Sequence, residues 1–177
     1  MTVEGTWAQV DSWVQRKAPA LHAAFLPPVD GRLADLPSDL AAWWGLFGGV
    51  DRVLLGDSSP LIPEYFHPLG ADAAVQLRDT CLSTSAGWLP GWLPIAIDFE
   101  GEDVLFVDLR GGAVWTCEHG HGPHAKPTWP SVTAMLEHLW RMLRHNDDPV
   151  HRLSLWSDGH LSWDVRPVLT PDSRPVQ

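Results

Sequence analysis

The sequence has few of the features that mark an exported, membrane-bound or disulfide-bonded protein. Its 177 residues include only two cysteines, and no uncharged apolar run approaches the length of about 18 residues that a membrane span requires. The first residues, MTVEGTWAQVDSW, lack the basic and apolar regions of a signal peptide. We therefore expect a cytoplasmic protein with no membrane partner, in which Cys81 and Cys117 are reduced thiols.

Basic residues are also scarce. Twelve Lys and Arg against twenty-two Asp and Glu give a formal net charge of −10. Proteins that bind nucleic acids neutralise phosphates with Lys and Arg, so this balance argues against a nucleic-acid partner. An acidic excess instead suits solubility or a basic protein partner.

Motifs for covalent catalysis and for nucleotide binding are missing. The chain contains no GxSxG, no GxxxxGK[ST] and no GxGxxG. His67, His138 and His160 stand singly on an expected extended segment, a helix and a hairpin, where a lone histidine is usually structural. No cofactor is expected.

What the chain does contain is the composition of one globular domain, with 45% hydrophobic and 19% charged residues. Eleven tryptophans are many for this length, and we expect most of them in the core. The domain should cover residues 1–166 and include a C-terminal hairpin. Residues 167–177 hold three prolines and are expected to form a disordered tail.

The stretch from residue 92 to residue 117 predicts a β-meander. Apolar runs at residues 93–97, 104–109 and 113–117 are separated by turn residues around Gly101 and at Gly111-Gly112. The middle run is apolar on both alternating faces, which indicates a central strand.

The spacing of apolar residues elsewhere predicts helices and short extended segments. A helix over residues 36–50 should begin at Pro37 or Ser38 and end at Gly48-Gly49, and residues 118–127 should form a polar loop. In the hairpin, a two-residue Asp158-Gly159 turn would place Trp156 opposite Leu161. The remaining predictions are helices over residues 4–17, 20–25, 71–82 and 131–145, a turn-rich segment at 29–35, a short strand at 53–55 and an extended, edge-like segment at 61–70.

One group of residues has the side chains of a metal site. Cys117, His119, His121 and His124 carry zinc-ligand atoms at short spacing, and a metal there would suggest a metal-dependent hydrolase. Structural zinc sites usually take ligand pairs from two separate elements, however, and histidines among glycines also describe an ordinary polar loop. The ordinary loop is the favoured interpretation, and the four residues remain weak metal candidates.

Acidic residues gather in and around the first turn of the meander. Carboxylates of this kind could act in acid–base chemistry or hold a hard cation, but the spacing matches no EF-hand loop. The group consists of Asp98, Glu100, Glu102, Asp103 and Asp108. A solvated turn is the simplest interpretation. The functional alternative is a negative patch that steers a basic protein partner.

Several motifs follow one another in a characteristic order. They are the tryptophan-rich N-terminal helix, LPSDLAAWWGLFGG as an LPxDL helix, Trp92-Leu93-Pro94-Ile95-Ala96 with Gly101, Asp103, Leu105, Asp108 and Leu109, Gly112 with Val114, and the SVTAMLEHLWRML helix. This ordered set resembles the SUKH superfamily of Smi/Knr-type and bacterial immunity proteins. The resemblance covers about residues 5–145, while the helix before LPxDL is reduced here to VDGRLAD and the terminal hairpin is an addition or a divergent extension.

The resemblance implies a single α+β domain whose mostly antiparallel sheet is flanked by helices and which has no catalytic residues. Many bacterial members of such families neutralise a toxin domain, often a nuclease, by direct binding. A regulatory scaffold of the cell-wall-signalling type is the other binding role to consider. For a toxin partner, we expect contacts at Asp98, Glu100, Glu102 and Asp103, with Trp88 and Trp92 as aromatic anchors.

Overall fold

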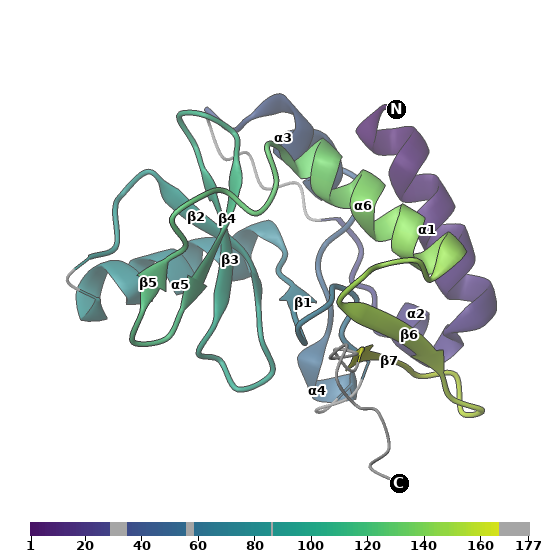
Figure 1. Cartoon of the computed structure of the whole chain (residues 1–177). Coiled ribbons are helices and arrows are strands. Elements are labelled where there is room, and N and C mark those ends of the chain that lie inside the picture. The colour runs from purple at the N-terminus through teal and green to yellow at the C-terminus, as the bar shows by residue number, and fades with distance from the viewer. Residues whose placement is uncertain (29–34, 56–58, 86, 167–177) are drawn as a thin grey trace, which may run out of the picture.

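The structure, a computed structural model, describes residues 1–28, 35–55, 59–85 and 87–166 (Figure 1). Over these ranges the chain has the expected α+β fold, with a five-stranded antiparallel sheet, a two-stranded hairpin and helices packed around them. The predicted tail at residues 167–177 and most of the turn-rich segment at 29–35 lie outside the described residues.

The predicted meander is confirmed as β2 (Trp92–Ile97), β3 (Val104–Asp108) and β4 (Val114–Glu118). The strand order β1-β2-β3-β4-β5 places β3 at the centre of the sheet, and its first four residues are buried, as their apolar pattern predicts. At the edges lie β1 (His67–Pro68) and β5 (Gly122–Pro123). The proline-rich segment therefore forms an edge as expected, whereas the loop predicted at 118–127 contains an additional strand.

Four predicted helices are present as α1 (Val3–Lys17), α2 (Pro19–Ala23), α5 (Ala71–Thr84) and α6 (Val132–His145). The side chain of Ser131 caps α6 by accepting a hydrogen bond from the backbone N–H three residues later. In Figure 1, α1 and α6 run side by side, while α5 packs against β2. None of the helices in the described ranges is long and apolar enough to cross a membrane.

The helix predicted over residues 36–50 is shorter than expected, because α3 (Ser38–Trp44) ends before the glycine pair. Gly48 instead lies where two backbone segments cross. Its N–H donates to the carbonyl of Leu26, and a Cβ atom at this position would collide with the carbonyl oxygen of Pro27. Gly48 is therefore needed for close backbone approach and not for ending a helix.

The strand predicted at residues 53–55 is wrong, since this segment forms the short helix α4 (Arg52–Leu55). The carboxylate of Asp51 accepts hydrogen bonds from the N–H groups of Val53 and Leu54 at 2.9 and 3.2 Å. Such a side-chain cap satisfies the first N–H groups of a helical turn, which outweighs the strand preference of the apolar residues.

The C-terminal hairpin is present as β6 (His151–Leu155) and β7 (Leu161–Val165), but its register differs from the prediction. Leu155, and not Trp156, pairs with the first residue of β7. The loop is longer than two residues and places Gly159 at a φ of 85°, a conformation that glycine adopts readily. Trp156 is consequently exposed at the end of the hairpin.

Tryptophans supply much of the core, as their number predicts. The indole N–H of Trp163 donates to the carbonyl of Pro60 at 3.1 Å and anchors the hairpin to the rest of the chain. Ser59 adds a second anchor, since its hydroxyl accepts a hydrogen bond from the N–H of Leu161 at 3.0 Å. The buried tryptophans are Trp7, Trp43, Trp44, Trp88 and Trp163.

Candidate functional site

A surface groove of about 450 Å³ is lined by residues from one end of the large sheet and from the C-terminal hairpin. It is built from a turn before β1, the β2–β3 turn, the ends of β4 and β5, and β6–β7. We call it the acidic groove. Its lining residues are Glu64, Tyr65, Asp98, Phe99, Glu100, Asp103, Glu118, His124, His151, Trp163 and Val165.

The lining of the acidic groove combines negative charge with exposed aromatic rings. Five of its eleven lining residues are acidic, and none of these described residues is lysine or arginine. Tyr65 and Phe99 are 45% and 36% exposed and meet edge to face with ring centroids 5.8 Å apart. This arrangement suits a basic surface that also offers apolar contacts.

The β2–β3 turn is held in place by Asp98. Its buried carboxylate accepts hydrogen bonds from three successive N–H groups, those of Gly101, Glu102 and Asp103, at 2.8, 2.8 and 3.1 Å. From the other side, Arg52 donates to the carbonyls of Asp98 and Phe99. The turn therefore presents Phe99 from a rigid backbone.

The turn before β1 carries backbone strain. Glu64 and Tyr65 both have positive φ, 64° and 66°, a conformation that side chains other than glycine rarely adopt. An antiparallel bridge between Ile62 and Phe66 closes the turn. Strain of this kind persists only where the surrounding structure imposes it, and such positions often belong to functional sites.

A smaller cavity of about 320 Å³ lies beside the acidic groove, and the two share Glu64 and His151. We call it the Glu64 cavity. Its size is at the lower end of the range of small-molecule pockets, roughly 300–1,000 Å³. Its walls are Pro63, Glu64, Phe66, Thr128, Trp129, His138, Met142, Asp148, Val150 and His151.

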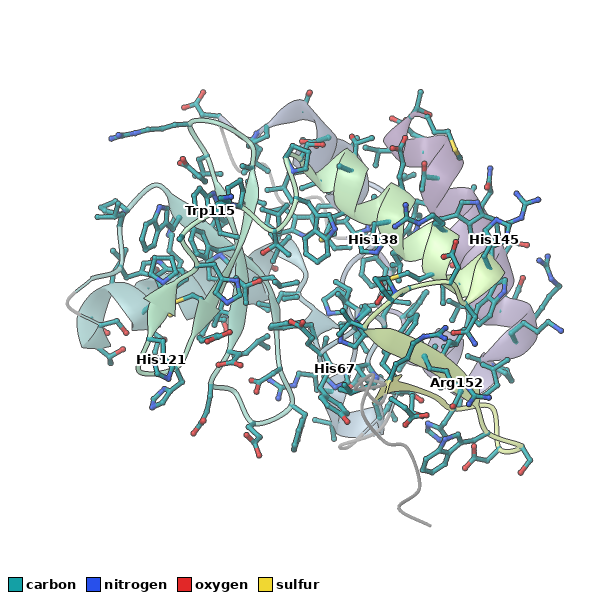
Figure 2. The ribbon with its side chains drawn as sticks, viewed as in Figure 1. His67, Trp115, His121, His138, His145 and Arg152 are labelled. Carbon is teal, nitrogen blue, oxygen red and sulfur yellow. The ribbon has the colours of Figure 1, made fainter. Side chains whose placement is uncertain are left out.

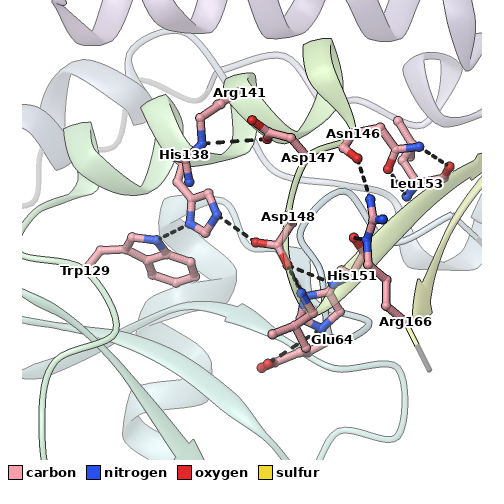
Figure 3. A network of polar contacts seen from close by, with 11 residues as sticks. Glu64, Trp129, His138, Arg141, Asn146, Asp147, Asp148, His151, Leu153 and Arg166 are labelled. Carbon is pink, nitrogen blue, oxygen red and sulfur yellow. Dashed lines mark hydrogen bonds and ion pairs between the residues drawn. The ribbon is translucent and has the colours of Figure 1, made fainter. Parts of the chain in front are cut away.

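A chain of polar contacts crosses this cavity (Figure 3). The indole N–H of Trp129 donates to Nδ1 of His138 at 2.9 Å, and Nε2 of His138 lies 3.2 Å from Oδ2 of Asp148. Oδ1 of Asp148 lies 3.3 Å from Nδ1 of His151, whose Nε2 lies 3.9 Å from Glu64. Two histidines therefore flank one carboxylate whose side chain is only 9% exposed.

The pKa of Asp148 is lowered in the folded protein. Burial acts to raise this pKa. Hydrogen bonds from the backbone N–H groups of His151 and Val150, the contact with His138 and the charge of His151 lower it by more than burial raises it. Asp148 is accordingly ionised at neutral pH and holds both imidazole rings in place.

The residues expected to contact a partner do not form one surface. Asp98, Glu100 and Asp103 line the acidic groove, and Asp98 is buried and committed to the turn. Glu102 instead lines a separate pocket that also contains Trp88 and Trp92. In this second pocket Trp88 is buried, and Trp92 stacks on the core at a 4.6 Å centroid distance from Phe106.

The four weak metal candidates, Cys117, His119, His121 and His124, are likewise distributed over different parts of the surface. Cys117 and His119 line the second pocket, whereas Nε2 of His124 lies in the acidic groove, 2.7 Å from the carboxylate of Glu118. Figure 2 shows His121 at the tip of β4–β5, pointing away from the sheet. Over the described parts of the chain, no three His, Cys, Asp or Glu side chains are placed to hold a metal ion together.

The two cysteines lie in the second pocket and are not joined. Burial raises the pKa of both thiols, and the neighbouring Cys81, Asp103 and Glu118 raise that of Cys117 further. A thiol with a raised pKa is a poor nucleophile and a poor metal ligand at neutral pH. Cys81 is partly buried and packs against the hydrophobic core.

Sequence reasoning missed most of the residues that shape the groove and the cavity. Glu64, Tyr65, Phe99 and His151 come from distant segments, and no local pattern marks them. Asp148 could have been identified from the sequence, because an aspartate before proline favours a side-chain turn of the kind that it makes here.

Comparison with known proteins shows that no protein-family model matches the chain and that no curated protein matches it.

Proposed function

We propose that the chain is a non-catalytic binding protein of the SUKH immunity type, which neutralises a toxin domain by holding a basic surface in the acidic groove. The observation that supports this proposal is the lining of the groove, where five acidic residues accompany two exposed aromatic rings and none of the described lining residues is lysine or arginine. The net charge of −10 agrees with a basic partner such as a nuclease domain.

The physical roles of the two kinds of side chain differ. Carboxylates around the rim raise the rate of association with a basic partner and disfavour acidic ones. Exposed aromatic rings at the centre of an interface supply much of the binding energy when they are buried by the partner. Phe99 and Tyr65 would be the anchors of this interface, in place of Trp88 and Trp92.

The direct experiment is capture of proteins from the native host on the immobilised chain, followed by an assay of what is bound. The proposal expects one predominant protein with a toxic activity, such as nuclease activity, that the chain inhibits stoichiometrically. Recovery of an endogenous signalling assembly would instead favour a regulatory scaffold, and a bound protein whose activity is unaffected would contradict neutralisation.

The contact surface can be tested with a matched pair of variants in the β2–β3 turn. Glu100→Lys and Glu102→Lys change the net charge equally at two exposed positions, but only Glu100 lines the acidic groove. Glu100→Lys should weaken toxin binding at least about tenfold at low salt and make it less salt-sensitive, while Glu102→Lys has a much smaller effect. Equal effects of both variants would exclude the groove as the contact surface.

A further inference from the structure

The hydrogen-bonding capacity of the Glu64 cavity can be assigned atom by atom. The indole N–H of Trp129 is only a donor, so Nδ1 of His138 must be the acceptor of the 2.9 Å bond between them. The proton of the neutral ring then lies on Nε2, which donates to Asp148 at 3.2 Å. Both nitrogens of His138 are therefore committed within the protein.

The same reasoning assigns the proton on Nδ1 of His151. Oδ1 of Asp148 accepts the backbone N–H groups of Val150 and His151, both at 2.8 Å, and faces Nδ1 of His151 at 3.3 Å. Because an ionised carboxylate only accepts, Nδ1 carries the proton. Nε2, which faces Oε1 of Glu64, is then an acceptor when the ring is neutral and carries a proton toward Glu64 when the ring is charged.

The distance between His151 and Glu64 allows both side chains to accept a hydrogen bond from one donor group. Nε2 lies 3.9 Å from Oε1 of Glu64, too far for a hydrogen bond between them, but close enough for both to accept from one group placed between them. The Glu64 side chain is 58% exposed and that of His151 is 11% exposed, so the pair stands at the mouth of the cavity. A forked N–H group fits two such acceptors.

The walls of the cavity include apolar and aromatic side chains. Phe66 and Met142 are buried, and the ring of Trp129 meets that of His138 edge to face at a centroid distance of 5.9 Å. Planar cations stack favourably on aromatic faces. The geometry points to a binding site for an amidinium or guanidinium group carried on an apolar stem, with the carboxylate of Glu64 and the neutral ring of His151 as its acceptors.

Two sources could supply such a group: a free small molecule or an arginine side chain of a protein partner. The cavity shares Glu64 and His151 with the acidic groove, so an arginine from a partner in the groove could enter it. The chemistry of the site is the same in both cases. Only the second source depends on the proposed function.

Benzamidine, a planar ring with an amidinium group, tests the site, and the neutral benzamide is its matched control. Titration of the intact protein would be followed by calorimetry and by the NMR signal of the Trp129 indole N–H, assigned with Trp129→Phe. Benzamidine should bind saturably and shift this signal, and benzamide should bind at least about tenfold more weakly.

Two variants locate the binding. Glu64→Gln should weaken benzamidine binding about tenfold or more, whereas Glu100→Gln, which removes a charge from the groove but not from the cavity, should leave it within about twofold. Absence of saturable binding, equal binding of benzamide, or an unchanged affinity in Glu64→Gln would each overturn the assignment.

Competition separates the two sources. If saturating benzamidine weakens binding of the toxin partner, the site receives an arginine of that partner. If partner affinity is unchanged, the site serves a free small molecule. Failure of the groove variants together with intact benzamidine binding would reject the proposed function and leave this site in place.

Discussion

Replacing Asp148 with asparagine should destabilise the fold by about 2 kcal/mol at neutral pH. The amide oxygen of asparagine can still accept the backbone N–H groups of Val150 and His151. Its NH₂ group, however, would face the Nε2–H of His138, whose other nitrogen is held by Trp129. The variant loses one hydrogen bond to a charged group at a position only 9% exposed, which typically costs about 1.5–3 kcal/mol.

The loss of stability in Asp148→Asn should also depend on pH. Burial acts to raise the pKa of Asp148, but the hydrogen bonds from His151, Val150 and His138 lower it overall in the folded protein. A lowered folded pKa stabilises the fold above the unfolded value of about 3.9, and this stabilisation is lost as the pH falls through the folded pKa. The difference between the wild-type protein and Asp148→Asn should therefore persist down to about pH 5 and shrink below about pH 4.

Urea denaturation followed by tryptophan fluorescence, at pH 7 and at pH 3, measures both effects. Asp147→Asn is the matched control, because its exposed carboxylate makes only a 3.9 Å contact with Arg141 and should change stability by less than about 0.5 kcal/mol. Equal destabilisation by the two variants, or a difference for Asp148→Asn that is as large at pH 3 as at pH 7, would refute the reasoning.

Three further changes test other parts of the structure. Gly48→Ala should lower the free energy of unfolding by about 3 kcal/mol in thermal or urea unfolding, because the added Cβ meets the carbonyl of Pro27. Trp163→Phe should cost about 1–3 kcal/mol by the same measurement, since the carbonyl of Pro60 loses its partner. Iodoacetamide should alkylate Cys81 and Cys117 more slowly than free cysteine at pH 7.5, because burial raises the pKa of both thiols, and unfolding in urea should remove the difference.

The parts of the fold that were predictable are those where one local pattern dominates. Alternating apolar runs separated by glycine turns predicted the three central strands, and helical spacing predicted α1, α5 and α6. The errors arose where a single side chain or a distant segment decides the conformation. Asp51 turns an apolar segment into α4, and the approach of Pro27 explains why Gly48 is required.

The candidate site was predictable only in part, because the groove is assembled from segments far apart in the sequence. Glu100 was identified from the cluster of acids around the β2–β3 turn, and it does line the groove. Tyr65 and Phe99 meet only after the turn before β1 folds against the end of the sheet. Neither residue belongs to a periodic pattern, so spacing within the sequence contains no sign of their contact.

Asp148 connects the stability of the hairpin to the geometry of the cavity. Its Oδ1 accepts the first N–H groups of the segment that enters β6, and the same oxygen faces Nδ1 of His151. The histidine ring is thus oriented by an interaction that the fold needs in any case. On the other side, the closed turn fixes the backbone that carries Glu64, whose side chain is 58% exposed. Since the ring of His151 is already oriented before a ligand arrives, the entropic cost of binding at this pair is reduced, as expected for a site that is preorganised on one side.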